Sequence, residues 1–504
     1  MCYGIWPEDE IAALRRDGFA ISSEDEAELL ALNGYWKGKT LVAREGALYD
    51  DERLWPFAQS GIVLPPWKSR EEGSGGGYAQ GGLGLGPGFY LVGVDYPKVL
   101  SGGLSQLIGE AEQELRRLRF TDADSVAKAQ FLRAVIIAHQ AIIRFSHRFA
   151  DLASRMAATE EDQRRKAELQ RIAETCRQVP AGPARTFFEA VQSFWFLFLL
   201  VTPSPTAAAG RFDQYMYPYY RRDMDDGKIT GEQALELLAC LRIKDMQINR
   251  VSGKVNRQKN EALAKWHNWT IGGVTPDGDD ATNDLTYLIL EAAKVSPTPH
   301  HTITVRVHER TPEALMEKAL EVVRTGIGMP AFVGDQSYID YLVGQGVPLR
   351  LAREYILTGC LDANVPGYSR VACIGMFIVP RVFDIFLHDG VDPNTSLRIG
   401  LPTGDLDQFR SFDDFFSAFK QQLVHFMRLT AERHTVQLSV LGEHFPDPVR
   451  SSLMTDGIAA GKDMLQRTMP FENAAVFNPI GMINVADSLA AVKQLVYDQR
   501  RVSL

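Results

Sequence analysis

The stretch Tyr355-Ile-Leu-Thr-Gly-Cys-Leu-Asp-Ala-Asn-Val-Pro-Gly367 places a thiol and a carboxylate, Cys360 and Asp362, two residues apart. Its first residues predict a buried strand, and the glycines and the proline predict a sharp turn around the pair. A free cysteine is most often a small buried hydrophobe. A carboxylate is an odd neighbour for a core thiol, because burying it unpaired is costly. Cys360 is therefore a candidate catalytic residue.

The carboxylate also limits what the thiol can do. A nearby negative charge disfavours the thiolate, so the pair suits ordinary thiolate attack poorly. It suits hydrogen-atom chemistry better, in which a neutral sulfur is wanted and the carboxylate moves protons. A histidine partner stays open as an alternative, since a Cys–His pair need only be close in space.

The bulk composition excludes several classes of function. The chain has 504 residues, of which 45% are apolar, enough for several domains or one large barrel. A net charge of -9 without a basic stripe argues against nucleic acid as a partner. The N-terminus does not read as a signal peptide. The longest apolar run, Phe194 to Val201, is far shorter than the ~20 residues of a bilayer span. We expect a cytoplasmic protein with no membrane partner.

The cysteines and histidines do not indicate a metal site. The five cysteines are Cys2, Cys176, Cys240, Cys360 and Cys373, and this odd, sparse set indicates a reducing compartment. No pair has the C-x-x-C spacing of a zinc or iron–sulfur site. His300 and His301 are adjacent, so in a strand they would point to opposite faces. Apart from Cys360, the cysteines fit a buried, inert interpretation.

Runs that predict strands alternate with helical segments in the second half of the chain. The strand-like runs are Trp269–Val274, Thr302–Val307, Ala331–Val333 and Tyr355–Leu357, and Pro312–Thr325 is helical in pattern. This alternation predicts a large α/β architecture. There is no internal repeat and no clear boundary, so we expect residues 1–504 to form a single domain.

The first half of the chain has helical periodicity. The predicted helices are 8–32, with a start near Ser22, then Ala127–Phe149, Glu160–Arg177, Phe187–Val201 and Gly231–Met246. Thr159 and Thr230 are the expected N-caps of the helices that follow them. The almost wholly apolar Phe187–Val201 should be a buried helix.

Two further segments carry unusual composition. The glycine-rich residues 66–90 fit neither the dinucleotide nor the phosphate-loop motif, which favours a structural or substrate-covering loop. The segment Gly210-Arg-Phe-Asp-Gln-Tyr-Met-Tyr-Pro-Tyr-Tyr220 concentrates charged and aromatic groups. Such groups can line a pocket and orient a polar substrate. The alternative is structural, with a helix start, inward-packed tyrosines and an Arg211–Asp213 pair.

Together these segments resemble the glycyl radical enzymes, the family that includes pyruvate formate-lyase, glycerol dehydratase and benzylsuccinate synthase. The matching segments follow the family order over roughly residues 35–500. They are Gly210 to Tyr219, Gly272 to Asn283, Val305 to His308, Gly328 to Ala331, Thr358 to Asp362 and Asn484 to Val496.

The resemblance implies a ten-stranded α/β barrel of two half-sheets, surrounded by helices, with Cys360 on a loop inside it. A radical stored on a backbone glycine would pass to Cys360, and the thiyl radical would abstract a substrate hydrogen atom. Asp362 stands where the family has a glutamate and would act as general acid or base. Arg211, Asp213 and Tyr215 belong to a segment that lines the substrate site in relatives.

The resemblance also implies partners. A radical S-adenosylmethionine activase would install the radical, no small-molecule cofactor would be bound, and the protein would be a homodimer or larger oligomer. The radical-glycine loop, similar to Arg-Val-x-Gly-Tyr, is not found in these residues. We therefore expect a barrel domain that lacks its N-terminal start and its C-terminal glycine-radical domain, and a chain that is inactive alone.

The sequence constrains the substrate less tightly than it constrains the family. Leu361 follows Cys360 where pyruvate formate-lyase has a second cysteine, which argues against formate acetyltransferase activity. The surroundings resemble the fumarate-adding enzymes and the arylacetate decarboxylases, and Arg370 is a candidate for binding a carboxylate. A dehydratase of the same family, a non-catalytic paralogue and a plain thiol hydrolase are the alternatives.

Overall fold

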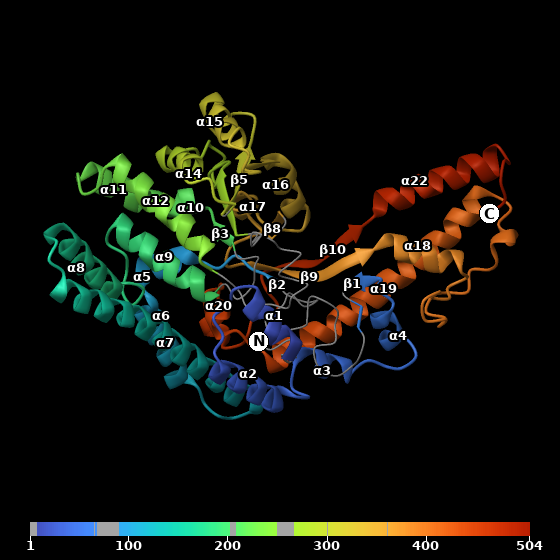
Figure 1. The fold of residues 1–504 in the computed structure, drawn as a ribbon, viewed down its shortest axis with the longest axis horizontal. Helices are drawn as coiled ribbons and strands as arrows, with labels where there is room; N and C mark the ends of the chain where they lie inside the picture. Colours follow the sequence, from blue (N-terminus) through green and yellow to red (C-terminus); the bar gives the residue numbers. More distant parts are fainter. Residues whose placement is uncertain are drawn as a thin grey trace.

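The computed structural model describes residues 8–64, 66–67, 90–201, 208–248, 267–299, 301–359 and 361–504. Its helices and strands alternate in the second half of the chain, which confirms the α/β prediction (Figure 1). The strands are β1 (Val63–Leu64), β2 (Tyr90–Leu91), β3 (Ala208–Gly210), β4 (Asn268–Gly272), β5 (Thr302–Val307), β6 (Ala331–Gly334), β7 (Ile356–Thr358), β8 (Asp362–Asn364), β9 (Ser369–Ile378) and β10 (Phe471–Ile480).

Helices make up most of the rest of the described chain. Those before β4 are α1 (Glu8–Arg16), α2 (Ser23–Trp36), α3 (Leu41–Gly46), α4 (Leu54–Gln59), α5 (Tyr96–Gly102), α6 (Leu104–Arg117), α7 (Ala123–Thr159), α8 (Gln163–Gln178), α9 (Phe187–Val201), α10 (Phe212–Tyr215), α11 (Tyr217–Asp225) and α12 (Gly231–Met246). Those after it are α14 (Asp284–Val295), α15 (Glu313–Val323), α16 (Asp335–Gly344), α17 (Leu349–Ala352), α18 (Val379–Leu387), α19 (Phe412–His444), α20 (Pro448–Ser452), α21 (Gly457–Ala460) and α22 (Met482–Val492). A 3-10 turn, η2 (Leu406–Gln408), and a π-helical segment, η3 (Lys493–Asp498), complete the set.

A parallel sheet of order β3-β4-β5-β6 carries three of the four predicted strands, and the fourth, Tyr355–Leu357, corresponds to β7 in a separate pair with β8. Successive side chains of a strand point to opposite faces. One face of β4 and β5 is apolar, with Trp269, Ile271, Ile303 and Val305 buried in the same core as α9, α14 and α15. The other face carries polar side chains, among them Thr270, which contacts the strand that leads to position 360. This polar inner face positions the site described below.

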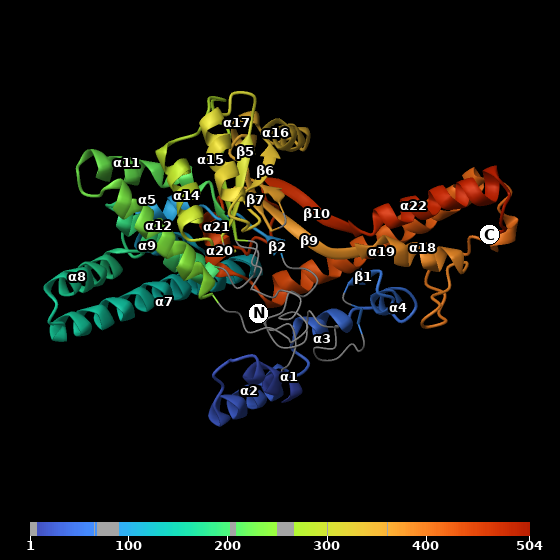
Figure 2. The same ribbon diagram turned by 45° about the horizontal axis from the view of Figure 1, so that its top comes forward.

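A second sheet joins distant parts of the chain. Its order is β1-β9-β10, with β2 also paired to β9. The ten-residue strands β9 and β10 run parallel, and they lead into an extended arm formed by α18, α19 and α22 (Figures 1 and 2). The sequence predicted neither long strand, because the apolar residues 371–380 lack the alternation of a half-buried strand.

Most predicted helices are confirmed, with one correction at a cap. α9 and α12 have the expected bounds, and Thr230 caps α12 through a capping box with Gln233. Thr159 is not an N-cap, because α7 continues through it. Asp162 caps α8 instead, accepting from the Arg165 backbone N–H at 2.9 Å. Residues 8–32 form two helices, with Ser22 as the N-cap of the second.

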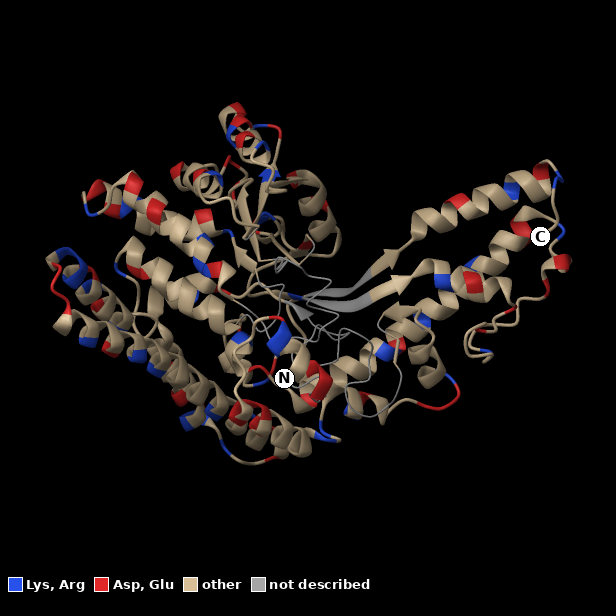
Figure 3. Ribbon diagram, in the orientation of Figure 1, with Lys and Arg blue, Asp and Glu red and all other residues tan. Residues whose placement is uncertain are grey.

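α7 is long and apolar enough, by length and composition, to cross a membrane. It packs against α6, α8 and α20 along a buried stripe, and it exposes charged side chains such as Arg133, Arg144 and Arg155. That pattern is typical of an amphipathic helix of a folded domain. Basic and acidic residues are interspersed over the helices of the described chain, with no basic stripe (Figure 3).

The structure describes the side chains of two of the cysteines that were expected to be buried. Cys176 is buried, as expected, and burial raises the pKa of its thiol to about 11. Cys240 is exposed on α12, so the expectation of a buried thiol there is wrong. Its position on the outer side of an amphipathic helix explains the difference. Cys2 and the glycine-rich residues 68–89 lie outside the described residues.

The contrast between two threonines gives a test of the capping assignment. Thr230→Ala removes a cap hydrogen bond from α12 and should lower the free energy of unfolding by about 1 kcal/mol. Thr159→Ala removes no N-cap and should change it by less than about 0.5 kcal/mol. Urea denaturation followed by circular dichroism measures both. Equal losses in the two variants would contradict the assignment.

Buried His139 predicts loss of stability in acid. Its Nε2 lies 2.8 Å from Ser452 Oγ, and burial lowers the pKa of the imidazole to about 4. Below its ordinary pKa of about 6.5, the unfolded chain therefore binds a proton that the folded chain does not. Stability falls with decreasing pH from about 6.5 towards 4, by up to about 1.4 kcal/mol per pH unit. In urea titrations between pH 7 and pH 5, His139→Gln should reduce this dependence, and an unchanged slope would contradict the assignment.

Candidate active site

A tight hairpin carries the Cys360–Asp362 stretch. β7 and β8 pair antiparallel, with Thr358 opposite Asp362, so the connection runs from Gly359 to Leu361. Gly359 has a φ of 52° and Leu361 a φ of 82°. The left-handed region costs a non-glycine residue roughly 1–2 kcal/mol, so the turn at Leu361 is strained. Cys360 itself lies outside the described residues.

Side chains from the inner face of the parallel sheet bind alternate backbone groups of the segment that leads into this hairpin. Arg306 Nη1 donates to Tyr355 O at 3.1 Å, Thr270 Oγ1 accepts from Leu357 N at 3.0 Å, and Asn268 Nδ2 donates to Gly359 O. The spacing of two residues matches the alternation of a strand. The segment is therefore held in one register from Tyr355 to the residue before Cys360.

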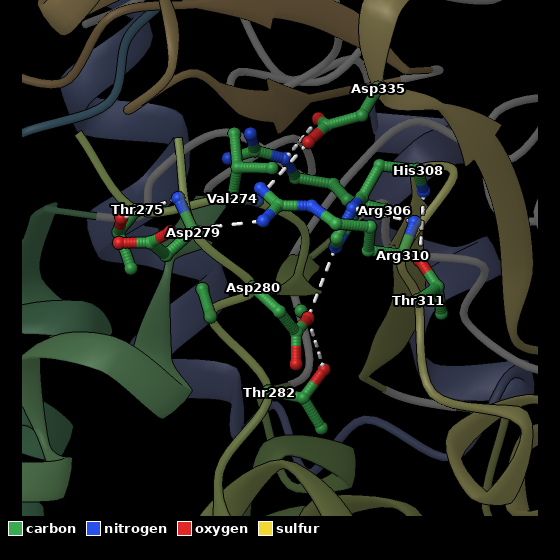
Figure 4. Close-up of polar contacts among 12 residues, drawn as sticks. Val274, Thr275, Asp279, Asp280, Thr282, Arg306, His308, Arg310, Thr311 and Asp335 are labelled. Carbon is green, nitrogen blue, oxygen red and sulfur yellow. Dashed lines mark hydrogen bonds and ion pairs between the residues drawn. The ribbon is translucent and has the colours of Figure 1, made fainter. Parts of the chain in front are cut away.

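The first of these contacts comes from a buried ion pair. Arg306 Nε lies 2.7 Å from Asp335 Oδ1, and both side chains are almost fully buried, at 0% and 1% exposed. Asp335 Oδ2 also accepts from Val274 N at 3.1 Å, and Arg306 Cζ lies 4.0 Å from the centroid of the Tyr355 ring. Figure 4 shows the carboxylate of Asp335 directed toward Arg306 and Val274. The ion pair joins β4, β5, α16 and the strand β7.

Gly273 makes room for the guanidinium. It has a φ of 75°, and a Cβ placed there would lie 2.4 Å from Arg306 Nε. A side chain at this position would displace Arg306 from Asp335. The glycine at position 273, the first residue after β4, is therefore required by the ion pair.

A second polar contact lies at the rim beside the ion pair. His308 Nε2 is 3.0 Å from Asp280 Oδ1, and Thr282 Oγ1 donates to the same oxygen at 2.9 Å (Figure 4). The contact ties the end of β5 to the loop after β4.

Asp362 is half-buried at the start of β8. Its backbone carbonyl accepts from Thr358 Oγ1 at 3.2 Å, which closes the hairpin. Tyr338 donates from its hydroxyl to Leu361 O at 3.2 Å on the other side of the turn. Burial, and to a smaller extent the charge of Asp362, raises the pKa of Tyr338. Asp362 thus lies within electrostatic reach of a phenol that also holds the turn.

Arg211 and Asp213 both bind the backbone of Gly272, a structural contact that differs from the expected Arg211–Asp213 pair. Arg211 pairs with Glu354 at 2.8 Å and donates to Gly272 O at 2.9 Å, while Asp213 accepts from Gly272 N at 2.9 Å. Burial raises the pKa of Asp213, and Arg211 opposes this effect. Tyr215 donates its hydroxyl to Ala209 O at 2.6 Å. A role of these three residues in substrate binding stays a prediction.

Arg370 lies apart from this group, near the start of β9. Its Nη1 donates to Met464 O, and its backbone pairs with Glu472 on β10. Burial, with smaller contributions from the charges of Arg433 and Arg370, lowers the pKa of His434 to about 4. Binding of a carboxylate by Arg370 also stays a prediction.

A buried cluster of one aspartate and two histidines was also not predicted from the sequence. Asp245 Oδ1 lies 2.7 Å from His267 Nδ1, and Asp245 Oδ2 lies 3.1 Å from His301 Nδ1. Burial would raise the pKa of Asp245, but the two histidines lower it. His267 precedes β4 and His301 precedes β5, so the cluster joins the starts of the two strands to α12. No group of three or more His, Cys, Asp or Glu side chains suited to a metal ion occurs among the described residues.

Comparison with known proteins places the chain in a family. A family model described as "Pyruvate formate lyase-like" matches residues 4–504. The chain belongs to the pyruvate formate lyase-like glycyl radical enzymes. The predicted family and its type of α/β barrel fold are thereby confirmed.

Relatives include both lyases and dehydratases. The chain is 35% identical over 423 residues to isethionate sulfite-lyase of Oleidesulfovibrio alaskensis, covering 81% of this chain and 50% of that protein. It is 31% identical to trans-4-hydroxy-L-proline dehydratase of Clostridioides difficile, covering 80% of this chain and 52% of that protein. The glycerol-bound structure of the B12-independent glycerol dehydratase of Clostridium butyricum superposes with a TM-score of 0.86 at 31% identity, covering 98% of this chain and 61% of that one.

The glycyl radical enzyme chain thus spans about half the length of the curated relatives it matches. The residues that hold the hairpin were not singled out as site residues from sequence, although Arg306 lies in a segment that resembles the family. A signal was present, because Thr302, Thr304 and Arg306 place polar groups at alternate positions of an otherwise apolar strand.

The Arg306–Asp335 pair should dominate the stability of this region. Arg306→Ala leaves a carboxylate buried without its partner and should lower the free energy of unfolding by about 3–5 kcal/mol. The matched control is Arg221→Ala, which breaks the exposed pair with Asp225 (2.8 Å) and should cost less than about 1 kcal/mol. Urea denaturation measures both variants. A loss for Arg306→Ala no larger than the control would show that the pair does not hold the sheet to β7.

Proposed function

We propose that Cys360 is the hydrogen-abstracting residue of a glycyl radical lyase, and that Asp362 is its proton-transfer partner. A thiyl radical on Cys360 would take a hydrogen atom from a substrate carbon, giving the thiol and a carbon radical. A group on the neighbouring carbon would then leave, with Asp362 supplying or accepting the proton that this elimination requires. The product radical would take the hydrogen atom back from the thiol.

The observation that carries this proposal is the hairpin between β7 and β8. Every second residue from Tyr355 to Gly359 is bound by a side chain of the sheet. A radical cannot be steered by charge, so its selectivity depends on position and on exclusion of other reactants. A rigid support on both sides of Cys360 meets that requirement. Family membership supplies the chemistry.

We propose a substrate in which the reacting carbon lies next to a hydroxyl or another leaving group. The relatives named above are an isethionate sulfite-lyase, a hydroxyproline dehydratase and a glycerol dehydratase, and each of the three compounds in these names carries a hydroxyl group. Fumarate addition and arylacetate decarboxylation, which the sequence favoured, are the competing reactions. For fumarate addition, Arg370 is the candidate carboxylate ligand, and Arg370 already donates to Met464 O.

Activation is part of the proposal. The radical would be installed on a glycine by a radical S-adenosylmethionine activase, and the active protein would be a cytoplasmic dimer or larger oligomer. Arg211, Asp213 and Tyr215 would then support the pocket by holding the ends of β3 and β4, whether or not they touch substrate.

Turnover of the full-length protein that carries the radical glycine, after activation, tests the roles of Cys360 and Asp362. After anaerobic activation, Cys360→Ala should abolish turnover while the glycyl radical doublet in electron paramagnetic resonance persists. Asp362→Asn should lower kcat by about 10²–10⁴, the usual contribution of a general acid or base. Normal turnover by Cys360→Ala would end the proposal. Loss of the doublet in that variant would instead point to a defect in activation.

A substrate panel separates the reaction classes. The activated protein is offered 1,2-propanediol, glycerol, hydroxyproline and isethionate, then fumarate with an aromatic hydrocarbon, then an arylacetate. Elimination product from the first group supports the proposed class. If a succinate adduct is the sole product, the reaction is fumarate addition and the proposed class is wrong. If carbon dioxide is the sole product, the reaction is decarboxylation and the proposed class is also wrong.

A further inference from the structure

A cavity of about 380 Å³ lies between four helices. Its walls come from α7, α8 and α9, and its end is closed by residues at the C-terminal end of α12. None of its described lining residues belongs to the parallel sheet or to the β7–β8 hairpin. The cavity is therefore a separate site from the one that holds Cys360 and Asp362. Its volume falls within the range of about 300–1,000 Å³ that is usual for small-molecule sites.

The cavity is lined mainly by apolar side chains. Phe145, Phe149 and Phe196 form a cluster with ring centroids 5.1, 5.8 and 5.9 Å apart. Phe149, Leu152 and Met156 form its outer lip and are 44%, 45% and 46% exposed. Three large apolar side chains left half in water beside a cavity indicate a surface that gains free energy when it is covered.

The charges at this cavity have one sign. Arg165 from α8 and Lys244 from α12 are the ionisable side chains, apart from the Cys176 thiol, among its described lining residues, and no carboxylate lines it. Arg165 is neutralised by Glu168 at 2.9 Å. Lys244 has no ion-pair partner among the described residues. The amides of Gln192 and Gln247 are the uncharged polar groups of the lining. An occupant that is complementary to these walls has an apolar body and one negative charge.

We propose that this cavity binds an alkyl carboxylate, with its chain against the phenylalanine cluster and its carboxylate paired with Lys244. The apolar walls provide affinity by removing the chain from water. The single unpaired ammonium group orients the ligand and selects the acid over the corresponding alcohol. The Cys176 thiol is part of the lining, and its small volume leaves part of the cavity open. Neither activation nor Cys360 enters this proposal, so it stands apart from the proposed function.

Isothermal titration calorimetry with octanoate and 1-octanol tests the site on the unactivated protein. One octanoate should bind per chain, and 1-octanol should bind about five-fold more weakly, because a partly exposed ion pair contributes up to about that factor. Lys244→Met should remove this preference by weakening octanoate about five-fold and leaving 1-octanol unchanged. Lys420→Met, a change of the same charge on α19, should leave both affinities unchanged. Equal affinity of the two ligands for the wild-type protein would overturn the proposal.

Filling the cavity tests its location. Cys176→Phe places a ring in the empty volume and should abolish binding of both ligands, with folding checked by circular dichroism. Where that variant does not fold, Leu152→Asp at the exposed lip is the second test, and it should weaken octanoate more than 1-octanol. Unchanged octanoate binding in a folded variant of either kind would overturn the site. Sedimentation of the same samples tests the competing occupant, which is a second copy of the chain. If the wild type binds no octanoate but forms a dimer that Leu152→Asp dissociates, this face is an interface between copies.

Discussion

The buried ion pair between Arg306 and Asp335 is the contact on which the candidate active site depends. Taking both charges out of water is costly, and their attraction offsets the cost only when the remaining donors and acceptors are also satisfied. Arg306 meets this condition by donating to Tyr355 O and Arg353 O, and Asp335 accepts from Val274 N. These partners lie just before β7 and just after β4. Satisfying the pair therefore places the hairpin strand against the sheet.

Several local features follow from this constraint. Gly273 has to lack a side chain because Arg306 Nε occupies that space. Thr270 and Asn268 lie on the same face as Arg306, so they continue its contacts along β7 at intervals of two residues. The left-handed conformation of Leu361 is then imposed from both sides, by the β7–β8 pairing and by the hydroxyl of Tyr338. Strain of this kind persists only where surrounding contacts over-determine the backbone.

The Gly210–Tyr220 segment has a related role. Arg211 and Asp213 bind the carbonyl and the amide of the same residue, Gly272, at the end of β4. Arg211 also pairs with Glu354, immediately before the hairpin strand. Two separate pairs of charged residues thus meet at the point where β4 ends and β7 begins. A lyase that uses a radical would gain from this rigidity, since position is what the protein contributes to such chemistry.

The sequence by itself determined the α/β class, the bounds of α9, α12 and β5, and the family, because periodicity, caps and ordered motifs are local properties of the chain. It could not show that Thr159 is the last residue of one helix and that Asp162 caps the next, since both residues can act as N-caps and packing decides between them. It did not predict β9 and β10, whose pairing joins residues about a hundred positions apart. The sequence likewise did not predict the partners of Arg306, Asp213 and Asp245. Ion pairs between distant elements form only when the strands are in register, so the tertiary structure alone decided which polar residues support the β7–β8 hairpin.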